Sequence, residues 1–278
     1  MPLENIKEKK EMKKLFYLGA LLLIISLTAC TSKINDVEEI KKAGVISLAT
    51  NATFAPFESV DGDTFTGIDI DIALAYSNYL GVKLNIKDQD FDAILPSIST
   101  GKADFAMAGI TKTPKREESV AFSKPYFVAS QVVIVKKGSS FNEATSQDEL
   151  LNLLSNNKAK LGCQRGTTGE AFIAGSSDMD FAGITNATCV SYDDGIMAAK
   201  ALENGQLDGV VIDKAVAELL ITNYADLVVI PYTLTEEEYA IAVNKANKEL
   251  LASLNNFIDI ISNDGTLDTI IGKYYEVK

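Results

Sequence analysis

The chain has 278 residues, of which 47% are hydrophobic and 23% are charged, proportions typical of a globular protein with one large or two ordinary domains. The formal net charge of −12 argues against partners such as nucleic acid and anionic membrane surfaces. The chain contains no histidine, which excludes Ser-His-Asp and Cys-His catalysis and the usual zinc sites. We expect no metal, and we also predict no catalytic residue and no cofactor.

The N-terminal segment has the layout of an export signal. Residues 12–30, "MKKLFYLGALLLIISLTAC", combine a basic start, an apolar run too short for a membrane span, and small residues before a cysteine. We expect a signal peptide over residues 1–29, with Met12 as its start and Met1 as the alternative. The ending "LTAC" resembles the lipobox of bacterial lipoproteins. That resemblance implies cleavage before Cys30, lipidation of its sulfur (palmitate) and a tether over residues 30–36. An ordinary signal peptide with an incidental cysteine is the alternative.

After the tether, strand-like and helix-like segments alternate, which predicts an α/β fold. The first unit has expected strands at 45–51, 82–88 and 105–111 and expected helices at 66–81 and 91–104. The second unit has expected strands at 159–164, 187–192 and 209–213 and expected helices at 167–175 and 193–208. The helix over 66–81 ends at Gly81, a suitable C-cap.

Both units contain an amphipathic helix, then Gly-x-x-Asp, then an apolar strand. The two copies are Gly101 to Asp104 and Gly205 to Asp208, and they indicate two lobes of related architecture. Further β-rich runs lie at 130–138 and 237–245, and helices follow the second run. We expect the second run to return to the first lobe, so that lobe 1 comprises residues 37–129 and 238–278 and lobe 2 comprises residues 130–237. Two crossing strands would then form a hinge.

Open α/β sheets bind ligands beyond the C-terminal ends of their strands, and polar side chains follow several of these ends. Arg116 can grip a carboxylate through two parallel hydrogen bonds. Thr167 and Thr168, after Gly166 at a helix start, can offer hydroxyls and backbone N–H groups to the same anion. Asp213, at the end of another strand, can bind an ammonium group. Together these groups predict a receptor for an α-amino acid.

Each of these residues also has an ordinary structural interpretation. Arg116 could be a solvated surface charge, the two threonines could cap a helix, and Asp213 could cap the helix near Ala215. Phe54 and Phe91, which could flank the apolar part of a ligand, could instead belong to the core. Their coincidence at strand ends of two lobes favours the ligand site.

The chain resembles the polar amino-acid substrate-binding proteins of ABC importers, a family that includes the bacterial glutamine- and histidine-binding proteins. The resemblance covers residues 44–275 and rests on "ATNATFAPFE", "GIDIDIALA", "FDAILPSISTGKADFAMAGITKTPKREESVAFSKPY", "GTTGEAF", "GQLDGVVID" and "NDGTLDTIIGKYY", in this order. It implies a two-lobed, type II periplasmic-binding-protein-like α/β fold with the second lobe inserted in the first. It also implies an extracytoplasmic, monomeric receptor that delivers an amino acid to permease and ATPase subunits in separate chains and catalyses nothing.

The resemblance also implies roles for individual residues. The ligand carboxylate would meet Arg116, Gly109, Thr111, Thr167 and Thr168. The ligand amine would meet Asp213, Thr111 and Ala108. The ligand side chain would lie among Asn51, Phe54, Phe91, Gln164 and Ile212.

The identity of the ligand side chain depends on the last group. The amides of Asn51 and Gln164 suit a neutral polar side chain such as that of glutamine, and Arg165 should face away from the pocket because side chains alternate along a strand. The alternative is a basic amino acid, lysine or arginine, with an acidic partner in or near the loop after the first strand: Glu58, Asp61 or Asp63. The same fold can also form an enzyme or a sensory domain, and both stay open as functions of this chain.

Two further cysteines, Cys163 and Cys189, fall in expected strands of one lobe. An exported compartment permits a disulfide. Parallel neighbouring strands offer poor disulfide geometry, so we expect two buried thiols and keep the disulfide as the alternative.

Overall fold

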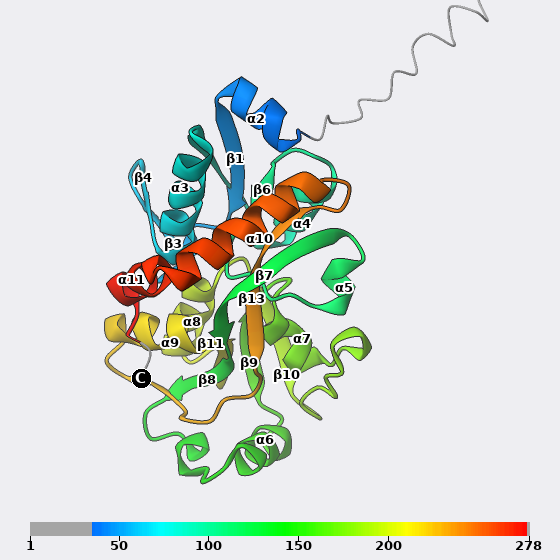
Figure 1. The fold of residues 1–278 in the computed structure, drawn as a ribbon. Coiled ribbons are helices and arrows are strands. Elements are labelled where there is room, and N and C mark those ends of the chain that lie inside the picture. Colours follow the sequence, from blue (N-terminus) through cyan, green and yellow to red (C-terminus); the bar gives the residue numbers. More distant parts are fainter. Residues whose placement is uncertain (1–34, 277–278) are drawn as a thin grey trace, which may run out of the picture. The chain divides into compact units, whose positions relative to one another are not determined.

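The computed structural model describes residues 35–276 (Figure 1). The expected signal peptide, Cys30 and all but the last two residues of the tether lie outside the described residues. Within residues 35–276, no helix combines the length and the apolar character required to span a bilayer.

The first lobe is built on a five-stranded sheet. Its strands lie in the order β5 (Lys83–Asp88), β1 (Val45–Thr50), β6 (Phe105–Ala106), β13 (Glu237–Asn244) and β7 (Val120–Ala129). β1 pairs in parallel with β5 and β6, whereas β13 is antiparallel to β6 and β7. The helices of this lobe are α2 (Val37–Ala43), α3 (Ile68–Leu80), α4 (Phe91–Ser99), α5 (Pro114–Glu117), α10 (Lys248–Asn263) and α11 (Thr266–Tyr274). A small antiparallel sheet contains β2 (Thr53–Phe54), β3 (Glu58–Asp61) and β4 (Thr64–Thr66).

The second lobe has a sheet of its own. Its strands lie in the order β10 (Thr188–Tyr192), β9 (Lys160–Gln164), β11 (Gly209–Asp213), β8 (Gln131–Lys136) and β12 (Leu227–Val229). Its helices are α6 (Gln147–Asn156), α7 (Thr168–Ala174), α8 (Gly195–Glu203) and α9 (Lys214–Leu220), with short 3-10 turns at Ser140–Glu143, Ser177–Met179 and Ile221–Asn223.

All strands of the second sheet come from the part of the chain between β7 and β13. In Figure 1 these strands run from green to yellow, whereas the first sheet combines blue, green and orange strands. The predicted two-lobed α/β fold with an inserted second lobe is therefore confirmed. The chain crosses between the lobes at Ser130 and again over residues 230–236. The expected lobe boundaries, after residues 129 and 237, stay a prediction, and β13 already begins at Glu237.

The Gly-x-x-Asp segments have the same role in both lobes. The Asp104 carboxylate accepts a hydrogen bond from the backbone N–H of Ser47 at 2.7 Å, and the Asp104 N–H donates to the Ser47 carbonyl at 3.0 Å. The Asp208 carboxylate accepts from the Lys160 N–H at 2.7 Å, and the Asp208 N–H donates to the Lys160 carbonyl at 2.8 Å. Each aspartate directly precedes a strand, β6 or β11, and ties its start to the parallel strand beside it, at Ser47 of β1 or at Lys160 of β9.

The expected strand over 105–111 is shorter than predicted, because β6 ends at Ala106. Gly109 adopts a φ of +54°, which turns the backbone out of the sheet direction. Its N–H donates to the carboxylate of Asp69 on α3 at 2.9 Å, and the Tyr126 hydroxyl donates to the same oxygen at 2.8 Å. A side chain 40 residues upstream therefore replaces the sheet partner and leaves residues 107–110 as a loop at the strand end.

Helices α3 and α10 pack against the first sheet through aromatic rings. The ring of Tyr76 on α3 lies 6.0 Å from that of Phe105 on β6 and 5.1 Å from that of Phe257 on α10. The Tyr76 hydroxyl donates to Ser253 at 2.9 Å, so this buried ring keeps a polar partner. This packing holds β6, and with it the loop that follows, in place.

Replacing Asp104 by alanine should lower the free energy of unfolding by about 2 kcal/mol, because hydrogen bonds to a charged acceptor are lost at a half-buried strand start. Urea denaturation followed by circular dichroism would measure this change. Asp208→Ala is the matched control at an exposed site and should cost less. Equal or larger destabilisation by Asp208→Ala would contradict the role assigned to burial at Asp104.

Candidate functional site

A small cavity lies between the two lobes, at the C-terminal ends of β6, β9 and β11. Its lining residues were all predicted from the sequence: Phe54, Phe91, Gly109, Thr111, Arg116, Gln164, Thr167, Thr168 and Asp213. They come from both lobes and from segments more than 150 residues apart. That they bind a ligand stays a prediction.

Arg116 is a buried charge and not a solvated one. Its side chain belongs to the short helix α5, and only 8% of the residue is exposed. Its Nη1 donates to the Thr111 carbonyl at 2.7 Å, its Nη2 donates to the Gly166 carbonyl of the second lobe at 3.0 Å, and its guanidinium lies 5.5 Å from the centre of the Phe91 ring. Burial lowers the pKa of Arg116 from its usual value, an effect that Glu237 opposes. The guanidinium thus bridges the lobes and faces the cavity.

Asp213 ends β11 and directly precedes α9, but its side chain makes no capping bond to that helix. Its carboxylate accepts instead from Gln131 Nε2 at 2.9 Å and from the Tyr239 hydroxyl. Burial raises the pKa of Asp213 to about 7, and the nearby Glu237 carboxylate acts in the same direction. Asp213 is therefore a buried acid at the cavity, held by two residues of the strands that cross between the lobes.

Glu237 is a buried site residue that was not predicted from the sequence. Its Oε2 accepts from the hydroxyls of Thr111 at 2.5 Å and Thr168 at 2.8 Å, and its Oε1 accepts from Thr235 at 2.7 Å. The hydroxyls of two predicted ligand-binding residues, Thr111 and Thr168, are thus connected through a second buried carboxylate. The sequence does contain a signal for this role, because side chains alternate along a strand. Glu237 therefore lies on the same face of β13 as Tyr239, whose hydroxyl donates to Asp213.

The two predicted amides meet across the lobes. Gln164 Nε2 donates to Asn51 Oδ1 at 2.8 Å, and Asn51 Nδ2 donates to the Gln89 carbonyl at 3.1 Å. Gln164 lines the cavity, whereas Asn51 does not and instead contacts Gln164 through this hydrogen bond. Arg165 faces away, as expected: it is exposed and its guanidinium lies 2.7 Å from Asp193 Oδ1.

Two other predicted residues do not line the cavity. Ile212 belongs to the core and packs toward α8, because a Cβ placed on Gly195 would lie only 2.4 Å from its Cδ1. Strand alternation explains this, since Asp213, the next residue, faces the cavity. Ala108 is buried within the loop after β6.

The three acids considered as partners for a cationic ligand side chain also lie away from the cavity. Glu58 is fully buried beside Asp69, and burial together with the Asp69 charge raises the pKa of Glu58 well above its usual value. Asp61 and Asp63 lie on the exposed hairpin of β3 and β4. None of the three candidates lines the cavity.

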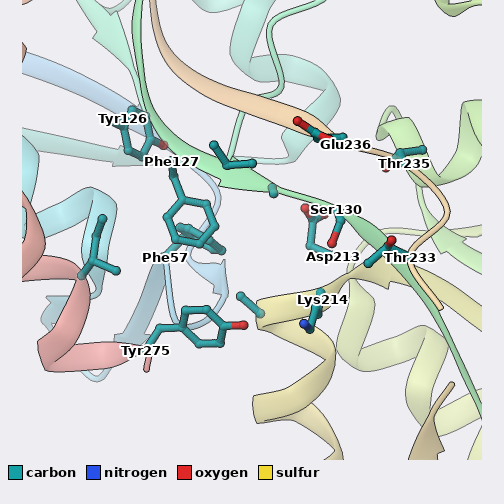
Figure 2. Close-up of a pocket in the computed structure, with 14 residues that line it drawn as sticks. Phe57, Tyr126, Phe127, Ser130, Asp213, Lys214, Thr233, Thr235, Glu236 and Tyr275 are labelled. Carbon is teal, nitrogen blue, oxygen red and sulfur yellow. The ribbon is translucent and has the colours of Figure 1, made fainter. Parts of the chain in front are cut away.

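A larger pocket of about 470 Å³ lies at the crossing between the lobes (Figure 2). Its walls come from the end of β7, the start of α9, residues 233–236 and the end of α11. Phe57, Phe127 and Tyr275 form an aromatic side of it, and Asp213 borders it as well as the smaller cavity. Arg116 and Gln164 do not line it, and its charged lining residues are Asp213, Lys214 and Glu236. The smaller cavity is the one that brings Arg116 and Asp213 together.

The chain is similar to known binding proteins over most of its length. Residues 46–277 match the family model for bacterial extracellular solute-binding proteins, family 3. A probable histidine-binding protein of Neisseria gonorrhoeae is 32% identical over 271 residues, covering 95% of this chain and 96% of that protein. Two solved structures of an ancestral arginine-binding protein also match. The arginine-bound one has a TM-score of 0.75 and 35% identity and covers 84% of this chain and 99% of that one. The glutamine-bound structure has a TM-score of 0.73 and 36% identity, and the match covers 84% of this chain and 98% of that one.

The ionisation of Asp213 should make the ligand-free protein less stable as the pH rises. An aspartate has an ordinary pKa of 3.8, so between about 4 and about 7 the folded protein retains a proton that the unfolded chain releases. We expect a higher melting temperature at pH 5 than at pH 8. Asp213→Asn, which cannot ionise, should reduce this difference without abolishing it, because burial also raises the pKa of Asp69 to about 6. If Asp213→Asn keeps the full difference in melting temperature between pH 5 and pH 8, the raised pKa of Asp213 is contradicted.

Proposed function

Because the chain belongs to family 3 of the bacterial extracellular solute-binding proteins, we propose that its inter-lobe cavity captures a free amino acid for delivery to a separate ABC importer. One observation carries this proposal. A buried guanidinium, Arg116, and a buried carboxylate, Asp213, line the same small cavity. These two charges are complementary to the carboxylate and the ammonium that an α-amino acid carries on one carbon.

In this proposal the ligand carboxylate binds Arg116. A guanidinium has five N–H donors, and its bonds to the carbonyls of Thr111 and Gly166 leave donors for two parallel bonds to a carboxylate. The hydroxyls of Thr111 and Thr168 turn from Glu237 toward the ligand. The ligand ammonium binds Asp213 and favours its ionised form.

The balance of buried charge favours a basic amino acid. Two buried carboxylates, Asp213 and Glu237, face one buried guanidinium, Arg116. A zwitterionic ligand leaves that imbalance unchanged, whereas a ligand with a net positive charge offsets it. The names of the similar proteins, which refer to histidine and arginine, support the same class.

Glutamine is the second candidate, favoured by a specific contact. The amides of Gln164 and Asn51 form a donor–acceptor pair that could accept a ligand amide in its place. One of the similar ancestral proteins was solved with glutamine bound.

The remaining parts of the proposal concern location and mechanism. The signal peptide and the lipid on Cys30 would keep the receptor outside the cytoplasmic membrane. A monomer would close around its ligand at the two crossings between the lobes, and the permease and ATPase subunits would be other chains. The ligand would be released unchanged, so mass spectrometry of the released compound separates this receptor from an enzyme on the same fold.

Arg116→Ala should weaken amino-acid binding by at least about 100-fold, which corresponds to about 3 kcal/mol for the loss of a buried charge partner. Isothermal titration calorimetry would measure the change, and circular dichroism would check the fold. Arg165→Ala is the matched control, because Arg165 is the other arginine of the chain and forms an exposed ion pair. Near-native affinity in Arg116→Ala would disprove the assigned polarity of the ligand.

A thermal-shift screen of the refolded, ligand-stripped protein against the twenty amino acids would test the ligand class. A ligand at about 100 times its Kd should stabilise the protein by about 2.7 kcal/mol. We expect shifts with arginine, lysine or histidine. A shift with glutamine alone would favour the second candidate, and no shift with any amino acid would contradict the proposed function.

The variant Glu237→Gln tests the charge argument within the same screen. It keeps an oxygen that can accept from Thr111 and Thr168 but removes one buried negative charge. It should weaken binding of a basic amino acid by about tenfold more than binding of glutamine. Equal effects on both ligands would contradict the role given to charge balance.

A further inference from the structure

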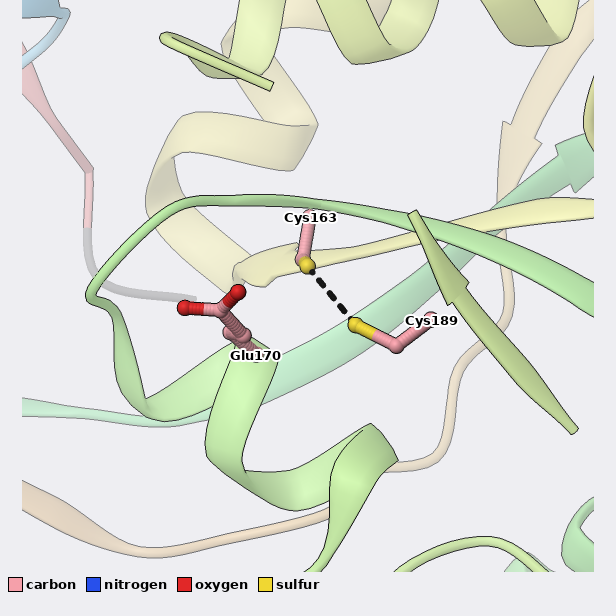
Figure 3. Close-up of side chains that lie close together, drawn as sticks. All are labelled: Cys163, Glu170 and Cys189. Atoms are coloured by element: carbon pink, nitrogen blue, oxygen red, sulfur yellow. Dashed lines mark hydrogen bonds between the residues drawn. The ribbon is translucent and has the colours of Figure 1, made fainter. Parts of the chain in front are cut away.

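Three side chains of the second lobe bring two sulfurs and a carboxylate together outside the ligand cavity (Figure 3). The Sγ atoms of Cys163 on β9 and Cys189 on β10 lie 3.2 Å apart, and the Glu170 carboxylate approaches them from α7. One ligand atom from each residue lies within 4.8 Å of the other two. None of the three residues lines the inter-lobe cavity.

We propose that Cys163, Cys189 and Glu170 form a binding site for a thiophilic divalent cation such as Zn²⁺. Two thiolates and a carboxylate are among the ligands that zinc takes in proteins, and soft sulfur ligands select it over magnesium and calcium. Binding releases one proton from each thiol and forms two metal–sulfur bonds, without any oxidation. The expectation of no metal was based on the absence of histidine, and this ligand set needs none.

The strand register favours a metal over a disulfide. In the parallel pairing of β9 and β10, Cys163 lies opposite Ser191 and Cys189 lies opposite Leu161, so the two cysteines are offset by two residues. Ideal strand spacing then separates their Cα atoms by about 8 Å. A disulfide needs less than about 7 Å. Both cysteines are free thiols, as expected, although Cys189 is only half-buried.

A bridging metal fits this offset with a small adjustment. Zn–S bonds of about 2.3 Å in tetrahedral geometry place two sulfurs about 3.8 Å apart, slightly more than the present contact. Rotation of the Cys189 side chain suffices, because Cys189 is the half-buried member of the pair while Cys163 is fully buried.

Glu170 can supply the third ligand without leaving its structural partner. One of its carboxylate oxygens accepts from the Gly166 N–H at 2.7 Å, and the other accepts from the Ser191 hydroxyl. The oxygen that accepts from Ser191 can bind the ion, while the other oxygen keeps its hydrogen bond to the Gly166 N–H. Ser191 or a water molecule completes four-fold coordination, and both Glu170 and Ser191 are half-buried, so an ion and water can reach them.

Cobalt and zinc titration of the reduced protein would test this site. The protein, kept reduced with a phosphine and stripped with a chelator, is titrated with Co²⁺, whose thiolate complexes absorb in the near ultraviolet, and Zn²⁺ then competes for the site. We expect one ion per chain and a gain in melting temperature with Zn²⁺. Cys189→Ser should weaken binding by about 100-fold, and Glu170→Gln, whose amide oxygen can still accept from Gly166, by about tenfold.

Cys30→Ser is the matched control in protein produced without lipidation, because it removes the third cysteine of the chain and should leave the metal affinity unchanged. The amino-acid affinity of Glu170→Gln should also stay within about twofold of the unmodified protein. A larger loss would show that the substitution had disturbed the loop at Gly166. Unchanged metal affinity in both Cys189→Ser and Glu170→Gln, or cobalt binding without thiolate absorption, would overturn the proposal. A Cys163–Cys189 disulfide that forms on air oxidation even with Zn²⁺ in excess would also overturn it.

Discussion

The burial of opposite charges between two lobes is the constraint on which the rest of this site depends. Arg116, Asp213 and Glu237 are all removed from water, and a buried charge costs several kcal/mol unless polar partners surround it. Neither lobe supplies enough partners alone. The guanidinium uses a carbonyl from each lobe, and Glu237 accepts hydroxyls from each. The cavity therefore exists only where the two sheets meet.

The same constraint explains why the strands that cross between the lobes supply several hydrogen bonds to the groups that line the cavity. Gln131 begins β8, and Glu237 and Tyr239 begin β13, directly at the crossings between the lobes. All three bond to groups that line the cavity. Opening the lobes would break the Arg116 bond to Gly166 and the Gln164 bond to Asn51. The residues at the crossings between the lobes are thus the same ones that hydrogen-bond to the buried acids.

The sequence predicted the parts of this arrangement that follow from local pattern. Alternating segments indicated the α/β fold. The rule that ligands bind at C-terminal strand ends selected Arg116, Thr167, Thr168 and Asp213, with Phe54 and Phe91 beside them. The resemblance to the amino-acid-binding family added Gly109, Thr111 and Gln164. The rule does not consider strands that enter a sheet from the hinge, so Gln131, Glu237 and Tyr239 were missed. Ile212 was misplaced because adjacent strand positions were assigned to one pocket.

Other features depended on contacts that local pattern does not contain. β6 ends early because Asp69, far upstream, takes the N–H of Gly109. The cysteines were correctly expected to be free thiols, but their offset across β9 and β10 required the register, which is set by the whole sheet.

The inserted topology also determines the order in which the chain can fold as it is synthesised. The second sheet is complete once residue 229 is available, whereas the first sheet lacks β13, the strand between β6 and β7, until residues 237–244 follow. During that interval β6, which pairs with β13 over only two residues, and β7 have open edges. Pairings such as Phe105 with Val243 close loops that contain the entire second lobe, and contacts of such long range form slowly. The last-made strand therefore controls when the first lobe is protected from association with other chains.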